Sequence, residues 1–196
     1  MKTMNPTVPI HCDENTSKLG VLILFGSITM LFITFLSTFG TMVAKELSYI
    51  KLSGMQQAIL VGNACLMILS SLLFDSGFRK WQSTKSTKSA RSHHFILSSH
   101  ILGLVFLFGQ ITIWQILVSD GLQSGSNVLA GMTYLMAGAH GVHLMTGLVF
   151  VAWIWIQLYR GTPIKPLRFR LIGWYWHFLT GLWIVLLSAI LILIQI

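Results

Sequence analysis

Histidine is the residue type in this sequence that could support chemistry, because its imidazole nitrogens ligate zinc and haem iron. Two short motifs place histidine among aromatic and small residues. They read Gly138-Ala139-His140-Gly141-Val142-His143 and Trp174-Tyr175-Trp176-His177-Phe178. A histidine that only packs against a neighbouring helix needs a hydrogen-bond partner and no metal. The first question is therefore whether these histidines are cofactor ligands or packing groups.

The spacing of the first motif does not match a zinc site. A helical zinc motif places two histidines at i and i+4 and adds an acidic residue. His140 and His143 are instead at i and i+3, near one face of a helix, with no acidic neighbour. We expect both side chains to pack and to donate to a carbonyl of a neighbouring helix. The sequence predicts no catalytic residue, no metal ligand and no cofactor-binding residue in this chain.

A second pair of histidines leaves one alternative open. Bis-histidine haem ligation requires two histidines from facing helices at matched depth in the membrane. His100 and His177 each lie about two turns into an apolar segment, toward the same side of the membrane. A b-type haem-binding anchor that passes electrons to quinone is therefore the alternative function.

Acidic residues are scarce, and each lies outside an apolar segment or at its end. They are Asp13, Glu14, Glu46, Asp75 and Asp120. Carboxylates at membrane depth are the usual groups of proton relays and ion sites. The sequence therefore argues against a pump or transporter that acts alone.

The elements that must position the histidines are long apolar helices. Hydrophobic residues make up 54% of the 196-residue chain and charged residues 9%, against about 25% charged in soluble domains. Backbone groups in lipid must be satisfied within their own segment, so apolar runs of about 20 residues become helices. We predict an all-α, polytopic membrane protein, with a cytoplasmic tail at 1–18 and a bundle of five transmembrane helices at 19–196. The spans are expected at about 19–44, 52–74, 93–119, 128–158 and 171–195.

The charges of the connecting loops predict the orientation. The connection at 79–91 contains five Lys or Arg residues and the one at 160–170 contains four, with no acidic residue in either. The connection at 45–51 has two lysines and one glutamate, and Asp120 is the only charged residue between the third and fourth spans. Because cytoplasmic loops carry the excess of Lys and Arg, we expect a cytoplasmic N-terminus and an external C-terminus.

Together the motifs resemble subunit III of the haem-copper oxidases, the cytochrome c and quinol oxidases of respiratory chains. The two histidine motifs, with Trp183 after the second, are the most specific part of this resemblance and occur in order on the last two spans. Asn63, Gln110 and Trp114 resemble residues of earlier helices of the family. Five spans rather than seven resembles the bacterial forms that lack the first two helices.

The resemblance implies a subunit of a terminal oxidase complex that has no catalytic centre, haem or copper of its own. It would pack beside catalytic subunit I in the bacterial inner (cytoplasmic) membrane, hold phospholipid, and stabilise subunit I while O2 is reduced to water with coupled proton translocation. Haem and copper are expected in the partner subunits. The family-motif and packing residues are then Asn63, Gln110, Trp114, Gly138, His140, Gly141, His143, Trp174, Tyr175, Trp176, His177 and Trp183. Lipid contacts are expected at His100, Arg168, Arg170 and Trp176.

The sequence departs from the family at three positions where an acid is frequent. These positions hold Ile28, Ile113 and Thr180. The replacement of all three acids by neutral residues argues against a direct part in proton handling, and it suggests a divergent or second copy of the subunit.

Overall fold

The computed structural model describes residues 14–45, 53–84, 90–121 and 128–195. These ranges form five α-helices and contain no strand. The helices are α1 (Glu14–Lys45), α2 (Gly54–Thr84), α3 (Ala90–Ser119), α4 (Val128–Arg160) and α5 (Pro166–Gln195). All five are long and apolar enough to cross a membrane. The prediction of an all-α chain with five such helices is confirmed.

The helices are longer than the predicted spans. Each has 30 to 33 residues, and at about 1.5 Å per residue this exceeds a hydrocarbon core about 30 Å thick. The largest difference is in α2, which continues ten residues beyond Phe74 to Thr84. An ion pair one turn apart, from Arg79 to Asp75 at 2.6 Å, lies in that extension. Apolar runs mark the hydrocarbon segment, whereas the helix continues wherever its own backbone bonds are satisfied.

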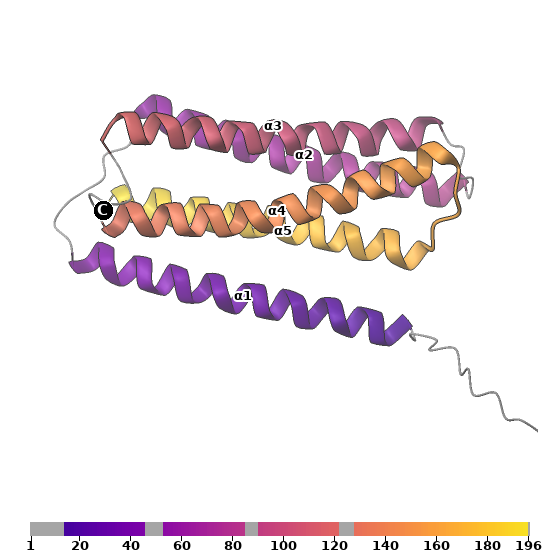
Figure 1. The fold of residues 1–196 in the computed structure, drawn as a ribbon, viewed down its shortest axis with the longest axis horizontal. Coiled ribbons are helices and arrows are strands. Elements are labelled where there is room, and N and C mark those ends of the chain that lie inside the picture. The colour runs from indigo at the N-terminus through magenta and orange to yellow at the C-terminus, as the bar shows by residue number, and fades with distance from the viewer. Residues whose placement is uncertain (1–13, 46–52, 85–89, 122–127, 196) are drawn as a thin grey trace, which may run out of the picture.

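Four of the helices form a closed arrangement, and the first lies outside it (Figure 1). Helix α2 packs against α3 and α5, and α4 packs against the same two helices. Helix α1 packs only on α4 and α5 among the described helices, and it runs along one edge of the molecule, at the bottom of Figure 1. Its buried residues are Ile28, Phe32 and Phe39. Helices α3 and α5 lie at opposite corners of the arrangement, so in the described part of the chain their backbones do not pack directly against each other.

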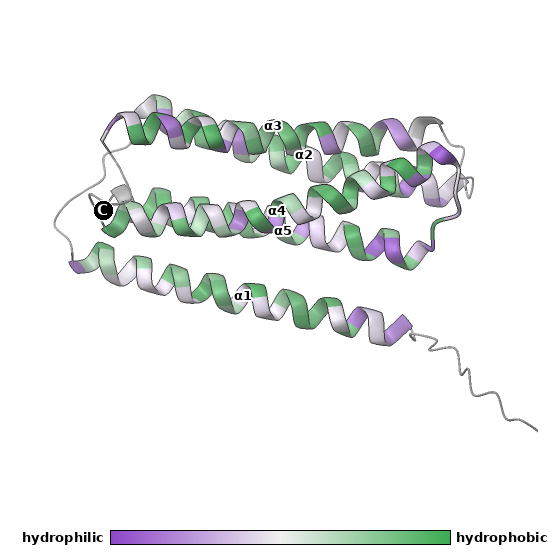
Figure 2. Ribbon diagram, in the orientation of Figure 1, coloured by the Kyte–Doolittle hydropathy of each residue, from purple (hydrophilic) through white to green (hydrophobic). Residues whose placement is uncertain are grey.

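The polar residues concentrate at the ends of the bundle, as Figure 2 shows. The middle of each helix is mostly apolar in Figure 2, and many large apolar residues are exposed, among them Met30 on α1, Phe108 on α3 and Val149 on α4. A soluble protein does not expose so many large apolar residues. The molecule is therefore built to be surrounded by lipid along its middle and by water at its two ends.

The short connection from α4 to α5 fixes the start of the last helix. Gly161 adopts a φ of 69°, a left-handed conformation that glycine reaches without strain. The amide of Gly161 donates to the Leu158 carbonyl at 3.2 Å, and the amide of Thr162 donates to the Gln157 carbonyl at 3.0 Å, so the last turn of α4 is capped. Pro166 then opens α5 at a position where a missing N–H costs nothing.

Candidate functional site

Trp176 lies at the centre of the bundle and is completely buried. Its indole N–H donates to Ser70 Oγ at 3.2 Å, and the Ser70 hydroxyl donates to the Ser99 carbonyl at 2.7 Å. A Cβ at Gly103 would lie 2.9 Å from the Trp176 ring, and a Cβ at Gly147 would lie 3.0 Å from it. One side chain of α5 is thus enclosed by the other three helices of the closed arrangement.

The expectation that Trp176 contacts lipid is wrong. A tryptophan at the end of a membrane helix commonly faces the lipid interface, because its ring is amphipathic. Here the indole N–H has a protein partner, and two glycines provide the space that the ring occupies. The sequence did not separate these two environments, because every face of α5 is rich in apolar residues.

His140 is buried in an aromatic environment. Its side chain is 1% exposed, and its ring lies 5.1 Å from the Trp183 ring, centroid to centroid. The rings of Phe32 and Phe106 approach edge-on, each at 6.4 Å. Neither nitrogen of His140 has a hydrogen-bond partner within the described residues. His140 therefore packs as expected, but the expected bond to a neighbouring helix carbonyl is not formed.

His143 bonds its own helix rather than a neighbour. Its Nδ1 lies 2.7 Å from the carbonyl oxygen of Ala139, one turn earlier on α4. The link between α4 and α5 is made by Tyr175, whose hydroxyl donates to the backbone carbonyl of His143 at 3.0 Å. Tyr175 thus makes the interhelical bond that the sequence led us to expect from the histidine.

The two histidines of the haem alternative lie on helices at opposite corners of the closed arrangement. His177 Nδ1 lies 2.5 Å from the Ser71 hydroxyl of α2. His100 belongs to α3, whose backbone does not pack directly against that of α5 in the described structure, although side chains of the two helices meet in the interior, where Trp176 reaches Gly103. Within the described ranges, no three His, Cys, Asp or Glu side chains come together as a group that could hold a metal ion. These observations show His177 engaged with α2 and give no contact between His177 and His100 in the described part of the chain.

Six of the motif residues line one cavity between α3, α4 and α5. Its volume is about 350 Å³. The motif residues among its lining are Gln110, Trp114, Gly138, His140, Gly141 and Trp183. Asn63 lies close by on α2, where its carboxamide occupies the space that a Cβ at Gly109 would need. The motifs therefore act together to shape the bundle interior, and no acidic side chain lines this cavity.

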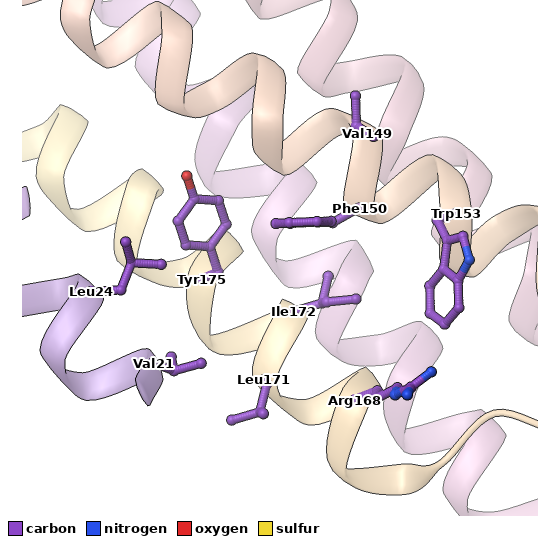
Figure 3. Close-up of a pocket in the computed structure, with 9 residues that line it drawn as sticks. All are labelled: Val21, Leu24, Val149, Phe150, Trp153, Arg168, Leu171, Ile172 and Tyr175. Atoms are coloured by element: carbon purple, nitrogen blue, oxygen red, sulfur yellow. The ribbon is translucent and has the colours of Figure 1, made fainter. Parts of the chain in front are cut away.

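A larger apolar cavity, the lateral groove, opens between α1, α4 and α5 (Figure 3). Its volume is about 540 Å³. It is lined by Val21, Leu24, Val149, Phe150, Trp153, Arg168, Leu171, Ile172 and Tyr175. Arg168 is the one charged residue among these nine, and Figure 3 shows it at the same end of the groove as Trp153. This combination places a cation at one end of an apolar surface.

The other expected lipid contacts lie elsewhere. Arg170 is exposed and His100 is half-buried on α3, and neither lines the lateral groove. From the sequence we predicted a lipid contact at Arg168, which lines the groove, but not the residues that shape the groove, such as Val149 and Phe150. No local signal could have identified them, because they become neighbours only when α1 packs on α4 and α5.

The three positions that lack the expected acids are all inside the bundle. Ile28 of α1 is 5% exposed, Ile113 of α3 is 1% exposed and Thr180 of α5 is 6% exposed. The hydroxyl of Thr180 donates to the Trp176 carbonyl of its own helix at 3.0 Å. None of the acidic residues in the described ranges is buried. The interior therefore has neutral side chains at each of these positions.

Comparison with known proteins gives distant relatives of one kind. No family model matches this chain. A probable cytochrome c oxidase subunit 3 of Mycobacterium bovis is 29% identical over 92 residues, which are 46% of this chain and 45% of the relative. The cytochrome bo(3) ubiquinol oxidase subunit 3 of Buchnera aphidicola is 26% identical over 64% of this chain and 66% of its own length. The quinol oxidase subunit 3 of Bacillus spizizenii is 25% identical over 95% of this chain and 93% of its own length.

The fold and the buried motifs define a multi-pass membrane protein whose histidine and tryptophan side chains pack the interior of a helical bundle. Together with the relatives, they identify the chain as a distant homologue of the subunit 3 family of cytochrome c and quinol oxidases. The match to the Mycobacterium relative spans about half the length of that relative.

Proposed function

We propose that this chain is a non-catalytic, lipid-binding subunit 3 of a respiratory haem-copper oxidase in a bacterial inner membrane. It packs beside catalytic subunit I, which together with other subunits holds the haem and copper, and it stabilises subunit I while O2 is reduced to water and protons are translocated. The observation that carries the lipid-binding part is the lateral groove with Arg168 at one end. The homology to oxidase subunits 3 supports the rest.

The chemistry of the groove suits a phospholipid. An acyl chain gains free energy when it lies against apolar side chains such as Leu24, Val149 and Ile172. A guanidinium offers bidentate hydrogen bonds to a phosphate, and Arg168 is exposed at the end of the groove. The indole of Trp153 at that end provides an amphipathic surface at the depth of a headgroup. The acyl chains, the phosphate and the headgroup of one phospholipid therefore each have a suitable partner in the groove.

Replacement of the cation should reduce retention of anionic lipid. In Arg168→Gln the groove keeps its apolar wall and loses the charged partner of the phosphate. We expect the purified complex to retain about fivefold less tightly bound anionic phospholipid, because a charge-assisted hydrogen bond contributes about 1.5–3 kcal/mol before exposure weakens it. Quantitative lipid mass spectrometry of the delipidated complex measures this ratio. The matched control is Arg160→Gln, since Arg160 is an exposed basic residue of α4 that does not line the groove. Equal lipid retention in both variants would contradict the assignment of Arg168.

The orientation is proposed from the charges at the two ends of the bundle. Arg79, Arg160 and Arg168 lie at the end that also carries the beginning of α1, and the positive-inside rule makes that end cytoplasmic. A topology reporter fused after Ser83 should therefore be in the cytoplasm, and one fused after Ile196 should be outside. An alkaline phosphatase and fluorescent protein pair reads both compartments. The same compartment for both fusions would overturn the odd number of spans and the orientation together.

The alternative function as a haem-binding anchor has less support. Its two candidate ligands lie on α3 and α5, whose backbones occupy opposite corners of the closed arrangement. The relatives are oxidase subunits 3. An absorption spectrum of the separated subunit distinguishes the two functions, since a reducible haem band is expected only for the anchor.

A further inference from the structure

We propose that the first half of α1, residues 14–27, is a gate that opens and closes the lateral groove to membrane lipid. The proposal rests on the proposed lipid-binding function, and it adds how a lipid enters and leaves that site. The α1 gate has three parts. They are a wall of the groove, a hinge at Gly26 and Ser27, and an aromatic latch at Phe25.

Helix α1 is attached to the bundle by apolar contact alone. Side-chain hydrogen bonds join α2 to α3, α2 to α5 and α4 to α5, as when Tyr175 donates to the His143 carbonyl. Within the described ranges α1 makes no such bond to another helix. Its bonded hydroxyl groups donate to carbonyls of α1 itself, and its ion pair, Lys18 to Glu14, also lies within the helix. Helix α1 can therefore move without breaking an interhelical hydrogen bond.

The two halves of α1 differ in how deeply they pack. Its three buried residues, Ile28, Phe32 and Phe39, all belong to the second half. None of residues 14–27 is buried. In Figure 1 the ribbon of α1 diverges from α4 and α5 toward Glu14. The second half is thus anchored, whereas the first half can swing outward with little loss of buried apolar surface.

The α1 gate forms one wall of the lateral groove. Val21 and Leu24 line the groove from α1, whereas Val149 lines it from α4 and Leu171 from α5 (Figure 3). The α4 and α5 walls are joined to each other by the hydrogen bond of Tyr175. Outward movement of the α1 gate therefore widens the groove, while the other two walls stay together.

The hinge lies where the unburied half of α1 meets the buried half. Gly26 and Ser27 immediately precede Ile28, the first buried residue of the helix. Glycine is a weak helix former, and glycine and serine pairs are frequent sites of helix bending. The Ser27 hydroxyl donates to the Ile23 carbonyl at 3.0 Å, a bond that competes with the helix ladder and favours bending. The backbone is therefore softest at the point about which the α1 gate would turn.

Phe25 provides the latch that holds the α1 gate closed. Its ring stacks on Phe178 of α5, with centroids 4.5 Å apart and planes 8° apart, and lies 6.3 Å from the Tyr175 ring. Both ring contacts of the α1 gate in the described structure involve Phe25. An aromatic pair favours the closed state by a factor of about five, which thermal motion overcomes readily. The latch is therefore weak enough to open and close repeatedly.

The exchange rate of a labelled lipid tests the hinge. The purified complex is loaded with deuterated phosphatidylglycerol and transferred into unlabelled lipid, and mass spectrometry follows the loss of label. Gly26→Ala should slow exchange about fivefold, because alanine is the better helix former and a Cβ there would meet nothing within 4 Å. Gly20→Ala is the matched control, since Gly20 is equally open and lies six residues before the hinge. Equal rates for the two variants would overturn the proposal.

The same exchange measurement tests the latch. Phe25→Ala should speed exchange about fivefold, because it removes the aromatic pair and leaves the hinge intact. Phe35→Ala is the control, since Phe35 is also half-buried on α1 but belongs to the anchored half. An exchange rate for Phe25→Ala equal to that of Phe35→Ala would also contradict the α1 gate.

Spin-label distances measure the movement itself. With both native cysteines replaced by serine, one label is placed at position 142 of α4 and the second at position 23 or 33 of α1. Ile23 belongs to the α1 gate and Ile33 to the anchored half, and both are exposed. We expect a broader distance distribution for the pair with position 23, and we expect Gly26→Ala to narrow it. Equal widths for the two pairs would show that the first half of α1 does not move separately.

The variant Arg168→Gln distinguishes failure of the site from failure of the α1 gate. If Arg168→Gln retains as much anionic lipid as the unmodified chain, the proposed lipid site is wrong, and the spin-label widths still decide whether the α1 gate moves. If Arg168→Gln loses lipid while Gly26→Ala exchanges it at the rate of Gly20→Ala, the lipid site stands and the α1 gate alone is wrong.

Discussion

Trp176→Ala should destabilise this protein more than any other single truncation in the bundle. The side chain is completely buried, contacts the positions of Gly103 and Gly147, and donates its indole N–H to Ser70. Removal of a fully enclosed tryptophan leaves a cavity and should cost about 3–5 kcal/mol of unfolding free energy. The unfolding midpoint of the purified chain in detergent, followed by tryptophan fluorescence and helicity, measures this loss.

Two further variants separate the contributions of Trp176. Trp176→Phe keeps a ring and removes the hydrogen bond to Ser70, so we expect a smaller cost of about 1–2 kcal/mol. Trp174→Ala is the matched control, because Trp174 is 39% exposed and should change the midpoint little. A midpoint for Trp176→Ala within error of Trp174→Ala would show that Trp176 is not enclosed as described.

Gly109→Ala should weaken the packing of α2 against α3. The Cβ of alanine at this position would occupy the space of the Asn63 carboxamide, and Asn63 is buried, with 6% of its surface exposed. Overpacking of a buried contact costs about 1–3 kcal/mol. Thermal unfolding in detergent should therefore show a clear loss, although alanine is the better helix former.

The contact between Asn63 and position 109 can be verified by a matched control and a double variant. Gly62→Ala adds the same methyl group to α2 where nothing lies within 4 Å, so it should be neutral or slightly stabilising. Asn63→Ala combined with Gly109→Ala should recover part of the loss, because residues in contact are not additive. If the two single glycine variants are equally stable, the close approach of Asn63 to Gly109 is not present.

The elements of this fold are predictable from sequence because lipid imposes a simple rule. Runs without charge become helices, and each of the five described helices contains one long uncharged run. The helix ends differ from the ends of these runs because residues such as Asp75 and Arg79 continue α2 outside the hydrocarbon, where water and an ion pair support the helix.

The faces of the helices are much harder to predict. In a soluble helix the polar side marks the surface, but in this chain both the buried Trp176 and the exposed Phe108 belong to apolar stretches. The hydrogen bond of Tyr175 to the His143 carbonyl and the enclosure of Trp176 by Gly103 and Gly147 depend on which helices become neighbours. That choice is made by long-range packing, which a single sequence does not encode in any local pattern.

The neutral interior limits what the subunit can do. Proton transfer through a membrane protein usually needs carboxylates at membrane depth, and Ile28, Ile113 and Thr180 occupy the buried positions where the family resemblance leads one to expect acids. Under the proposed function, the chain influences turnover through packing and lipid rather than through its own proton relay. A hydrophobic carboxyl reagent should accordingly find no target among these three side chains.

The proposed role is tested most directly by an oxidase complex purified with and without this chain. Haem content and the initial rate of O2 reduction should be nearly equal in the two preparations, because the haem and copper belong to other subunits. The preparation without the chain should lose activity sooner during continuous turnover, since its catalytic subunit lacks the neighbouring bundle and the lipid held there. Immediate loss of haem or of the initial rate on removal of the chain would contradict a non-catalytic, stabilising subunit.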